Sequence, residues 1–161
     1  MIPILSEILE PFRWAVFKIV MRPRFASKKQ GRCTIFAGED FISRADLGFE
    51  MIQKADSGLW CEILNTRFDV IEESEEGSYW STSRKRFTAY RYIVDGDIET
   101  TACALVSCFM MSKEVDGWTW WQRYVSHPPL VSSIEKSIEW MEEHGFENAA
   151  SCHLKRYLGV E

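Results

Sequence analysis

The sequence predicts a single α+β domain, spanning residues 1–161, around a curved antiparallel sheet. Two Asp-Gly pairs, Asp95-Gly96 and Asp116-Gly117, separate apolar, β-prone runs between Tyr79 and Val125. Asp-Gly suits the type I′ hairpin turn, because both central residues of that turn have positive φ. Amphipathic helical patterns precede and follow this region. We therefore expect a three-stranded meander with Asp-Gly turns, packed by an N-terminal amphipathic helix and C-terminal helices.

Length and composition support one folded unit with a substantial core. The chain has 161 residues, 46% of them hydrophobic, so it should bury roughly 70% of the surface that its unfolded form exposes. No repeat, low-complexity tract or long linker divides it. Aromatic residues make up 14%, with seven Trp, which is more large rings than such a core usually needs. We expect some of these rings to lie at a binding surface.

The first helical pattern covers residues 4–20. Its apolar positions recur every three or four residues, which places them on one helix face. Pro11 should kink or restart this helix, and Pro23 should end it, before a basic tail. We expect the stripe to pack across the sheet; an interfacial membrane helix or a partner-docking helix is the alternative. The stripe consists of Ile4, Leu5, Ile8, Leu9, Phe12, Ala15, Val16, Ile19 and Val20.

The next segments alternate between strand and helix patterns. Residues 32–37 form a strand candidate, and a helix with a weak capping box at Ser43 follows. The run 56–58 should stop this helix, since Gly58 can adopt the left-handed conformation. Residues 59–64 and 68–71 then read as two strands of a hairpin that turns at 65–66.

The middle of the predicted meander, residues 97–115, is longer than the five or six residues usual for a strand. We expect a bent strand, on the strength of the two turn signals. The alternative is a helix capped by Asp97, with Ala102, Leu105 and Phe109 on one face.

Residues 118–124 alternate as a strand does, with Trp121 and Arg123 on one face. If that face is exposed, it carries the residue pair most enriched at binding hot spots. After Pro128-Pro129, the capping box Ser132-x-x-Glu135 predicts a helix that ends at 144–145. A last short helix should begin at Asn148.

Charge is unevenly distributed along the chain. Residues 1–32 contain seven Lys or Arg and two acids, so they contribute +5 and residues 33–161 contribute −10 to the net charge of −5. An acidic body of this kind argues against nucleic acid as a partner. The densest acidic run lies at 72–77. It is a solvated loop, an acidic patch that meets a basic partner, or a metal-binding loop, although it lacks the alternating oxygen ligands and glycine of a calcium loop.

Motifs for chemistry are missing from the sequence. Gly-rich phosphate loops do not occur, and the three histidines lie 17 and 9 residues apart, unlike metal ligands. The five cysteines form an odd set without Cys-x-x-Cys, which favours reduced thiols and a cytoplasmic protein. The first apolar run is too interrupted for a membrane span, so we expect no membrane partner. We expect no cofactor, no metal and no catalytic residue.

These observations favour a non-catalytic inhibitor or immunity-type protein that engages a basic site on another protein. Its acidic, Trp-bearing surface would comprise Glu72, Glu73, Glu75, Glu76, Trp121 and Arg123. The alternative is a small enzyme or ligand-binding protein with an aromatic pocket enclosed by the curved sheet. A pocket that converges on His127, Asp69 or Cys152 would favour this alternative.

Overall fold

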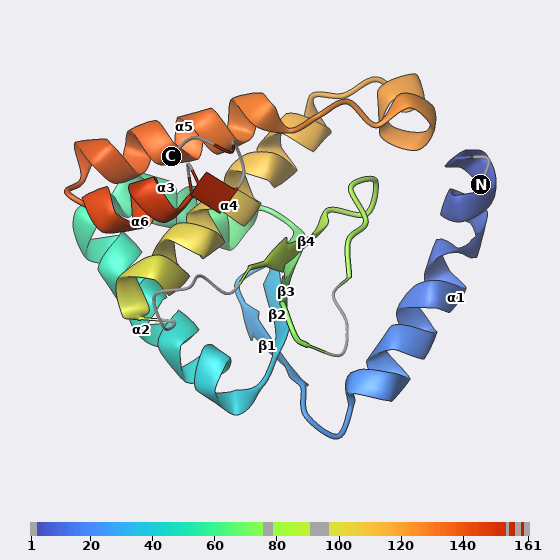
Figure 1. The fold of residues 1–161 in the computed structure, drawn as a ribbon, viewed down its shortest axis with the longest axis horizontal. Helices are drawn as coiled ribbons and strands as arrows, with labels where there is room; N and C mark the ends of the chain where they lie inside the picture. Colours follow the sequence, from blue (N-terminus) through green and yellow to red (C-terminus); the bar gives the residue numbers. More distant parts are fainter. Residues whose placement is uncertain (1–2, 76–78, 91–96, 154, 157–158, 160–161) are drawn as a thin grey trace.

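The computed structural model describes residues 3–75, 79–90, 97–153, 155–156 and 159. It is an α+β fold in which helices predominate (Figure 1). In chain order the elements are α1 (Pro3–Met21), β1 (Ala26–Gln30), β2 (Cys33–Ala37), α2 (Glu39–Ala55), α3 (Ser57–Asn65), β3 (Phe68–Glu72), β4 (Arg86–Ala89), α4 (Ile98–Asp116), the π-helical turn η1 (Gln122–Ser126), α5 (Val131–Glu143) and α6 (Glu147–His153).

The sheet is open and mixed, with the strand order β1-β2-β3-β4. Strands β1 and β2 form an antiparallel hairpin that turns at Gly31, whereas β2, β3 and β4 run parallel. In the parallel part Ile35 lies opposite Val70, and Val70 lies opposite Phe87. Parallel neighbours need crossover connections, and helices α2 and α3 supply the one between β2 and β3.

The two faces of the sheet bury different side chains, because alternate strand residues point to opposite sides. One face carries Ile35, Val70 and Phe87 and packs against the helices that follow β2. The other carries Phe36 and Ile71 and faces α1. Figure 1 shows α1 on the side of the sheet opposite α2 to α6.

Helix α4 is the centre of the larger core. It is buried around most of its circumference, from Thr100 to Phe109, and packs on α2, α5 and the sheet. Gly48 of α2 permits the close approach of α2, since a Cβ there would lie 3.2 Å from the Ala102 backbone. A helix that is apolar all round belongs in an interior.

The structure corrects the predicted meander. The segment expected as a bent strand is α4, and Asp97 caps it by accepting a hydrogen bond from the Thr100 N–H. Asp116-Gly117 is the end of this helix and not a hairpin turn, because Gly117 has a φ of −80°. Asp95-Gly96 lies outside the described residues. The sheet is therefore not an antiparallel meander.

Two further strand predictions are wrong, and several others are confirmed. Residues 59–64 belong to helix α3, and the Trp-rich segment 118–124 leads into η1. Strands at 33–37 and 68–72 and the helices at 39–55 and 131–143 lie close to their expected places. Short apolar runs fit a strand or a buried helix equally well, which explains the errors.

A glycine pair tests the hairpin and the corrected helix end together. Gly31 has a φ of +60°, and a Cβ there would lie 2.4 Å from the Leu64 carbonyl oxygen. We expect Gly31→Ala to lower the free energy of unfolding by at least about 2 kcal/mol, because both the backbone conformation and the contact become strained. Gly117→Ala is the matched control and should change stability by less than about 1 kcal/mol. Urea unfolding followed by circular dichroism measures both, and equal losses would contradict the assignment.

Candidate functional site

The most unusual surface of the protein is the outer face of α1, which we define as Ile4, Leu5, Ile8, Leu9, Phe12, Val16, Ile19 and Val20. These side chains are between 42% and 71% exposed. They are the same stripe that the sequence predicted to pack on the sheet, so that expectation is wrong. Large apolar side chains in a row are uncommon on a soluble surface and mark places that bind something.

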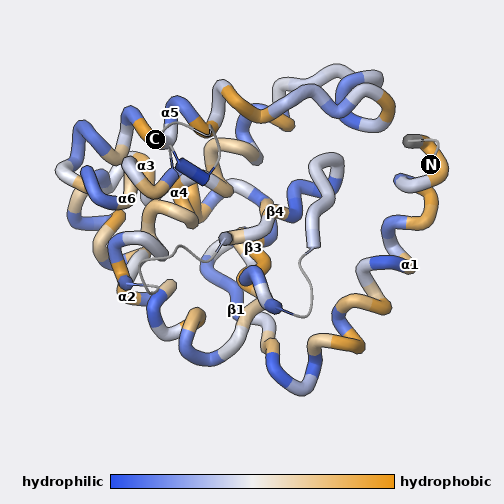
Figure 2. Tube along the Cα trace, viewed as in Figure 1, coloured by the Kyte–Doolittle hydropathy of each residue, from blue (hydrophilic) through white to orange (hydrophobic). Residues whose placement is uncertain are grey.

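Helix α1 packs on the protein with its opposite side. At about 100° per residue, Glu10, Trp14, Phe17 and Met21 point away from the outer face. Trp14 and Phe17 join a cluster with Phe36, Ile71, Met21, Phe25 and Tyr79. The Trp14 and Tyr79 ring centroids are 4.8 Å apart. Figure 2 shows apolar residues recurring along the whole of α1.

A buried ion network fixes the rotation of α1 about its axis. Glu10 is only 2% exposed; its carboxylate pairs with Arg86 and accepts a 2.8 Å hydrogen bond from the Tyr79 hydroxyl. Arg86 also donates to Asp69 at 3.1 Å and stacks over Trp14 at 4.6 Å. Burial and the Glu10 carboxylate raise the pKa of Tyr79, so its hydroxyl stays a donor. Turning the apolar face inward would break this network.

The edges of the outer face are basic. By helical geometry Arg13 and Lys18 lie along opposite edges, and Arg22, just after the helix, lines a depression with Lys18 and Ile19. The two acids of α1 are on its inner side: Glu10 pairs with Arg86, and Glu7 accepts a hydrogen bond from Ser83. The outward side of α1 therefore combines apolar side chains with positive charge.

Two exposed tryptophans lie close to this helix. Trp120 is 64% exposed and Trp121 is 59% exposed, in the turn that leads into η1. The turn η1 packs against α1, and Figure 1 shows it beside the N-terminal half of that helix. Trp121 is thus on the surface, whereas Arg123 is half-buried and donates to the Val115 carbonyl at 2.8 Å.

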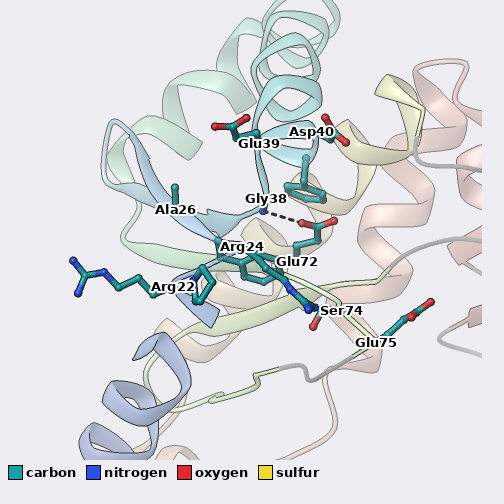
Figure 3. A pocket seen from close by; sticks show the side chains of 12 residues that line it. Arg22, Arg24, Ala26, Gly38, Glu39, Asp40, Glu72, Ser74 and Glu75 are labelled. Atoms are coloured by element: carbon teal, nitrogen blue, oxygen red, sulfur yellow. Dashed lines mark hydrogen bonds between the residues drawn. The ribbon is translucent and has the colours of Figure 1, made fainter. Parts of the chain in front are cut away.

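The expected acidic surface is not gathered in one place. Glu72 is 4% exposed and accepts a 3.0 Å hydrogen bond from the Gly38 N–H at the start of α2, where a carboxylate is favoured (Figure 3). Glu73 pairs with Arg156 at 3.1 Å. Glu75 is exposed and lines a cleft beside Arg22 and Arg24. Glu76 lies outside the described residues.

Trp121 and Arg123 lie toward the other end of the sheet. Arg123 lines a depression with Phe68 and Asp69, at the start of β3, whereas Glu72 is the last residue of that strand. Five strand residues separate the two ends by about 13 Å. The five of these residues that the structure describes therefore occupy two separate regions.

A cavity of about 600 Å³ lies between α1 and the α4–α5 side of the protein, and we call it the α1 cavity. It contains one of the polar groups that the sequence singled out, His127, whose Nε2 is 3.6 Å from the Glu7 carboxylate. Glu7 and Arg13 contribute from α1 and Ser81 from the segment before β4. The other lining residues are Ser6, Trp80, Thr82, Tyr90, Met111, Pro128, Pro129, Leu130 and Ile134.

Four buried reactive side chains among the described residues are held in their neutral forms. Burial raises the pKa values of the Cys33, Cys103 and Cys108 thiols, which keeps them neutral and weakly nucleophilic. Burial lowers the pKa of His153 to about 4, so this histidine is neutral at pH 7. Within the described residues, no three His, Cys, Asp or Glu side chains are placed to hold a metal ion.

Comparisons with protein families, curated proteins and solved structures found no match to this chain. None of the helices in the described part of the chain has the length and apolar character needed to cross a membrane. The sequence did contain the signal for the outer face of α1: a wide apolar stripe followed directly by a basic tail.

The Glu10 network can be tested through stability. Glu10→Ala leaves Arg86 partly buried beside Tyr79 without its main partner, so we expect the free energy of unfolding to fall by about 3–5 kcal/mol. Asp46→Ala is the matched control, because it breaks an ion pair at the surface. In that pair Lys28 is 40% exposed and Asp46 is 42% exposed. The control should cost at most about 1 kcal/mol. A loss at Glu10 no larger than that at Asp46 would mean that the network does not hold α1.

Proposed function

We propose that this chain is a peripheral binding protein that docks on an anionic membrane surface through the outer face of α1, lying on the bilayer without crossing it. The observation that carries the proposal is a helix whose apolar side is exposed while its other side is fixed to the protein by a buried ion network. Helices that lie at the membrane interface have an apolar face with basic residues beside it.

The apolar and basic side chains of this surface can provide several kcal/mol of docking free energy. Burying a Leu, Ile or Phe fully contributes about 1.5–3 kcal/mol, so burying the exposed half of one contributes about 1 kcal/mol. The outer face offers eight large apolar side chains, hence several kcal/mol in total. Each Lys or Arg near an anionic surface adds about 1 kcal/mol. Lys18 and Arg22 are exposed and line one depression with Ile19 of the outer face.

An anionic bilayer fits this surface better than a second copy of the chain. Two outer faces packed against each other would bring their basic edges together, and both acids of α1 are engaged on its inner side. A bilayer accepts the apolar side chains among its acyl chains and meets the basic edges with phosphate groups. The sequence-based expectation of no membrane partner rested on the lack of a spanning segment, which a surface helix does not require.

The acidic-interface hypothesis stays a separate prediction. Glu75 and Trp121 are exposed and remain available to a basic partner, but Glu72 and Glu73 have internal partners. These residues are distributed over two regions. They therefore offer a partner a smaller continuous surface than the outer face of α1 does.

Vesicle binding tests the proposal. The wild-type chain should co-sediment with vesicles that contain phosphatidylserine and much less with pure phosphatidylcholine vesicles, and added salt should weaken the binding. Replacing Ile8, Phe12 and Ile19 together with Ser should lower partitioning by at least about tenfold, equal to ~1.4 kcal/mol. Lys18→Gln with Arg22→Gln should remove most of the salt dependence.

Controls separate this mode from general stickiness. Leu47 and Val131 are comparably exposed apolar residues on α2 and α5, so Leu47→Ser and Val131→Ser should leave vesicle binding unchanged. Light scattering coupled to gel filtration gives the oligomeric state of the same variants. A stable dimer that the triple Ser variant dissociates, with no binding of the wild type to anionic vesicles, would overturn the proposal in favour of self-association.

A further inference from the structure

We infer that the α1 cavity is a binding site for a small amphipathic carboxylate, a molecule with an apolar body and one carboxylate head. This inference does not depend on membrane docking, because no residue of the outer face lines the cavity. A ligand-binding protein is the alternative function that the sequence predicts, favoured by a pocket at His127. The α1 cavity provides a location and a ligand class for that alternative.

The cavity has the size and walls of a small-molecule site. Its volume of about 600 Å³ lies within the range of roughly 300–1,000 Å³ for ligand pockets. Met111, Leu130 and Ile134 provide an apolar wall from α4 and the start of α5. Trp80 is held in place, since its Nε1–H donates to Thr82 Oγ1 at 2.9 Å and its ring packs edge-on against Phe87 at 5.3 Å. A preformed wall lowers the cost of ordering on binding.

One polar group of the cavity is left without a partner. The Ser81 hydroxyl is buried and makes no hydrogen bond to any described residue. Buried hydroxyls are normally satisfied, so an unpaired one in a cavity wall points to a missing ligand atom. The backbone of Ser81 is fixed by two hydrogen bonds with Arg86, which leaves the side chain no freedom to move far.

The polar side chains around the cavity favour a ligand group that accepts hydrogen bonds over one that donates them. Glu7 already accepts a hydrogen bond from Ser83 and lies 3.6 Å from the His127 ring. Arg13 donates to Ser6 at 3.2 Å and keeps further N–H donors for a ligand. A guanidinium in the cavity wall pairs best with a carboxylate.

His127 is held in an uncommon backbone conformation at this place. Its φ is 42°, in the left-handed region, although the next residue is a proline. Its N–H donates to the Gln122 carbonyl at 3.0 Å, which ends η1 and aims the imidazole toward Glu7. Such strain is found where a side chain must be positioned, and here it places the imidazole beside the Glu7 carboxylate in the cavity wall.

Calorimetric titration without lipid tests the site. The probes are 4-phenylbutyrate and its uncharged analogue 4-phenyl-1-butanol, which share the apolar body. We expect the carboxylate to bind about tenfold more tightly than the alcohol. Arg13→Gln should remove this preference, and Ser81→Ala should weaken carboxylate binding by about threefold to tenfold. Ile134→Trp, which fills the cavity, should abolish binding of both probes.

Ile8→Ser is the control, because Ile8 lies on the outer face of α1 and does not line the cavity. It should leave both affinities unchanged, which excludes adsorption of the probe to that face. Circular dichroism melts establish whether each variant is folded. If Ile134→Trp is unfolded, Ser81→Ala and Arg13→Gln decide the test. The absence of saturable carboxylate binding up to about 10 mM, or binding that Arg13→Gln and Ser81→Ala leave unchanged, would overturn the inference.

Discussion

The pairing of Glu10 with Arg86 is the interaction on which the arrangement of α1 depends. A helix that is apolar on most of its surface could rotate and bury its aliphatic stripe against the sheet, which hydrophobic burial alone would favour. The face of the sheet on this side presents Asp69 and Arg86 as well as Phe36 and Ile71, so it needs a carboxylate opposite the guanidinium. Turning the helix would leave Arg86 with Asp69 alone and would expose Trp14 and Phe17, and these losses offset what the aliphatic contacts would contribute. The polar and aromatic side of α1 is therefore the side that packs inward.

This choice explains why the sequence predicted the helix but not its orientation. The three-to-four-residue spacing from Ile4 to Val20 correctly predicts α1, and Pro23 correctly lies after its end. The same spacing is compatible with a core helix and with a surface helix. What decides between them is Arg86, 76 residues away, which no local pattern connects to Glu10. The docking surface thus needed tertiary information, although every residue on it was visible in the sequence.

Helix α4 shows the converse case. Residues 97–115 lack a polar face because they are surrounded by other elements, so periodicity could not separate a strand from a buried helix. Asp97 carried the deciding local signal, as a cap that accepts from the Thr100 N–H. Asp116-Gly117 resembled a hairpin turn, but glycine is also common at helix ends. The parallel pairing of β2 and β3 likewise follows from helices, since α2 and α3 and not a short turn connect these two strands.

The segregation of charge along the chain acquires a physical role if α1 is the docking element. Residues 1–32 carry +5, most of it just after α1, and the remainder carries −10, so an anionic surface attracts this first part of the chain and repels the rest. Glu72 and Glu73 contribute to the acidic side even though they are paired internally, because long-range potential depends on charge and not on exposure alone. Attraction and repulsion together orient the protein with α1 toward the surface. Screening by salt weakens both forces, so orientation and affinity should decrease together as ionic strength rises.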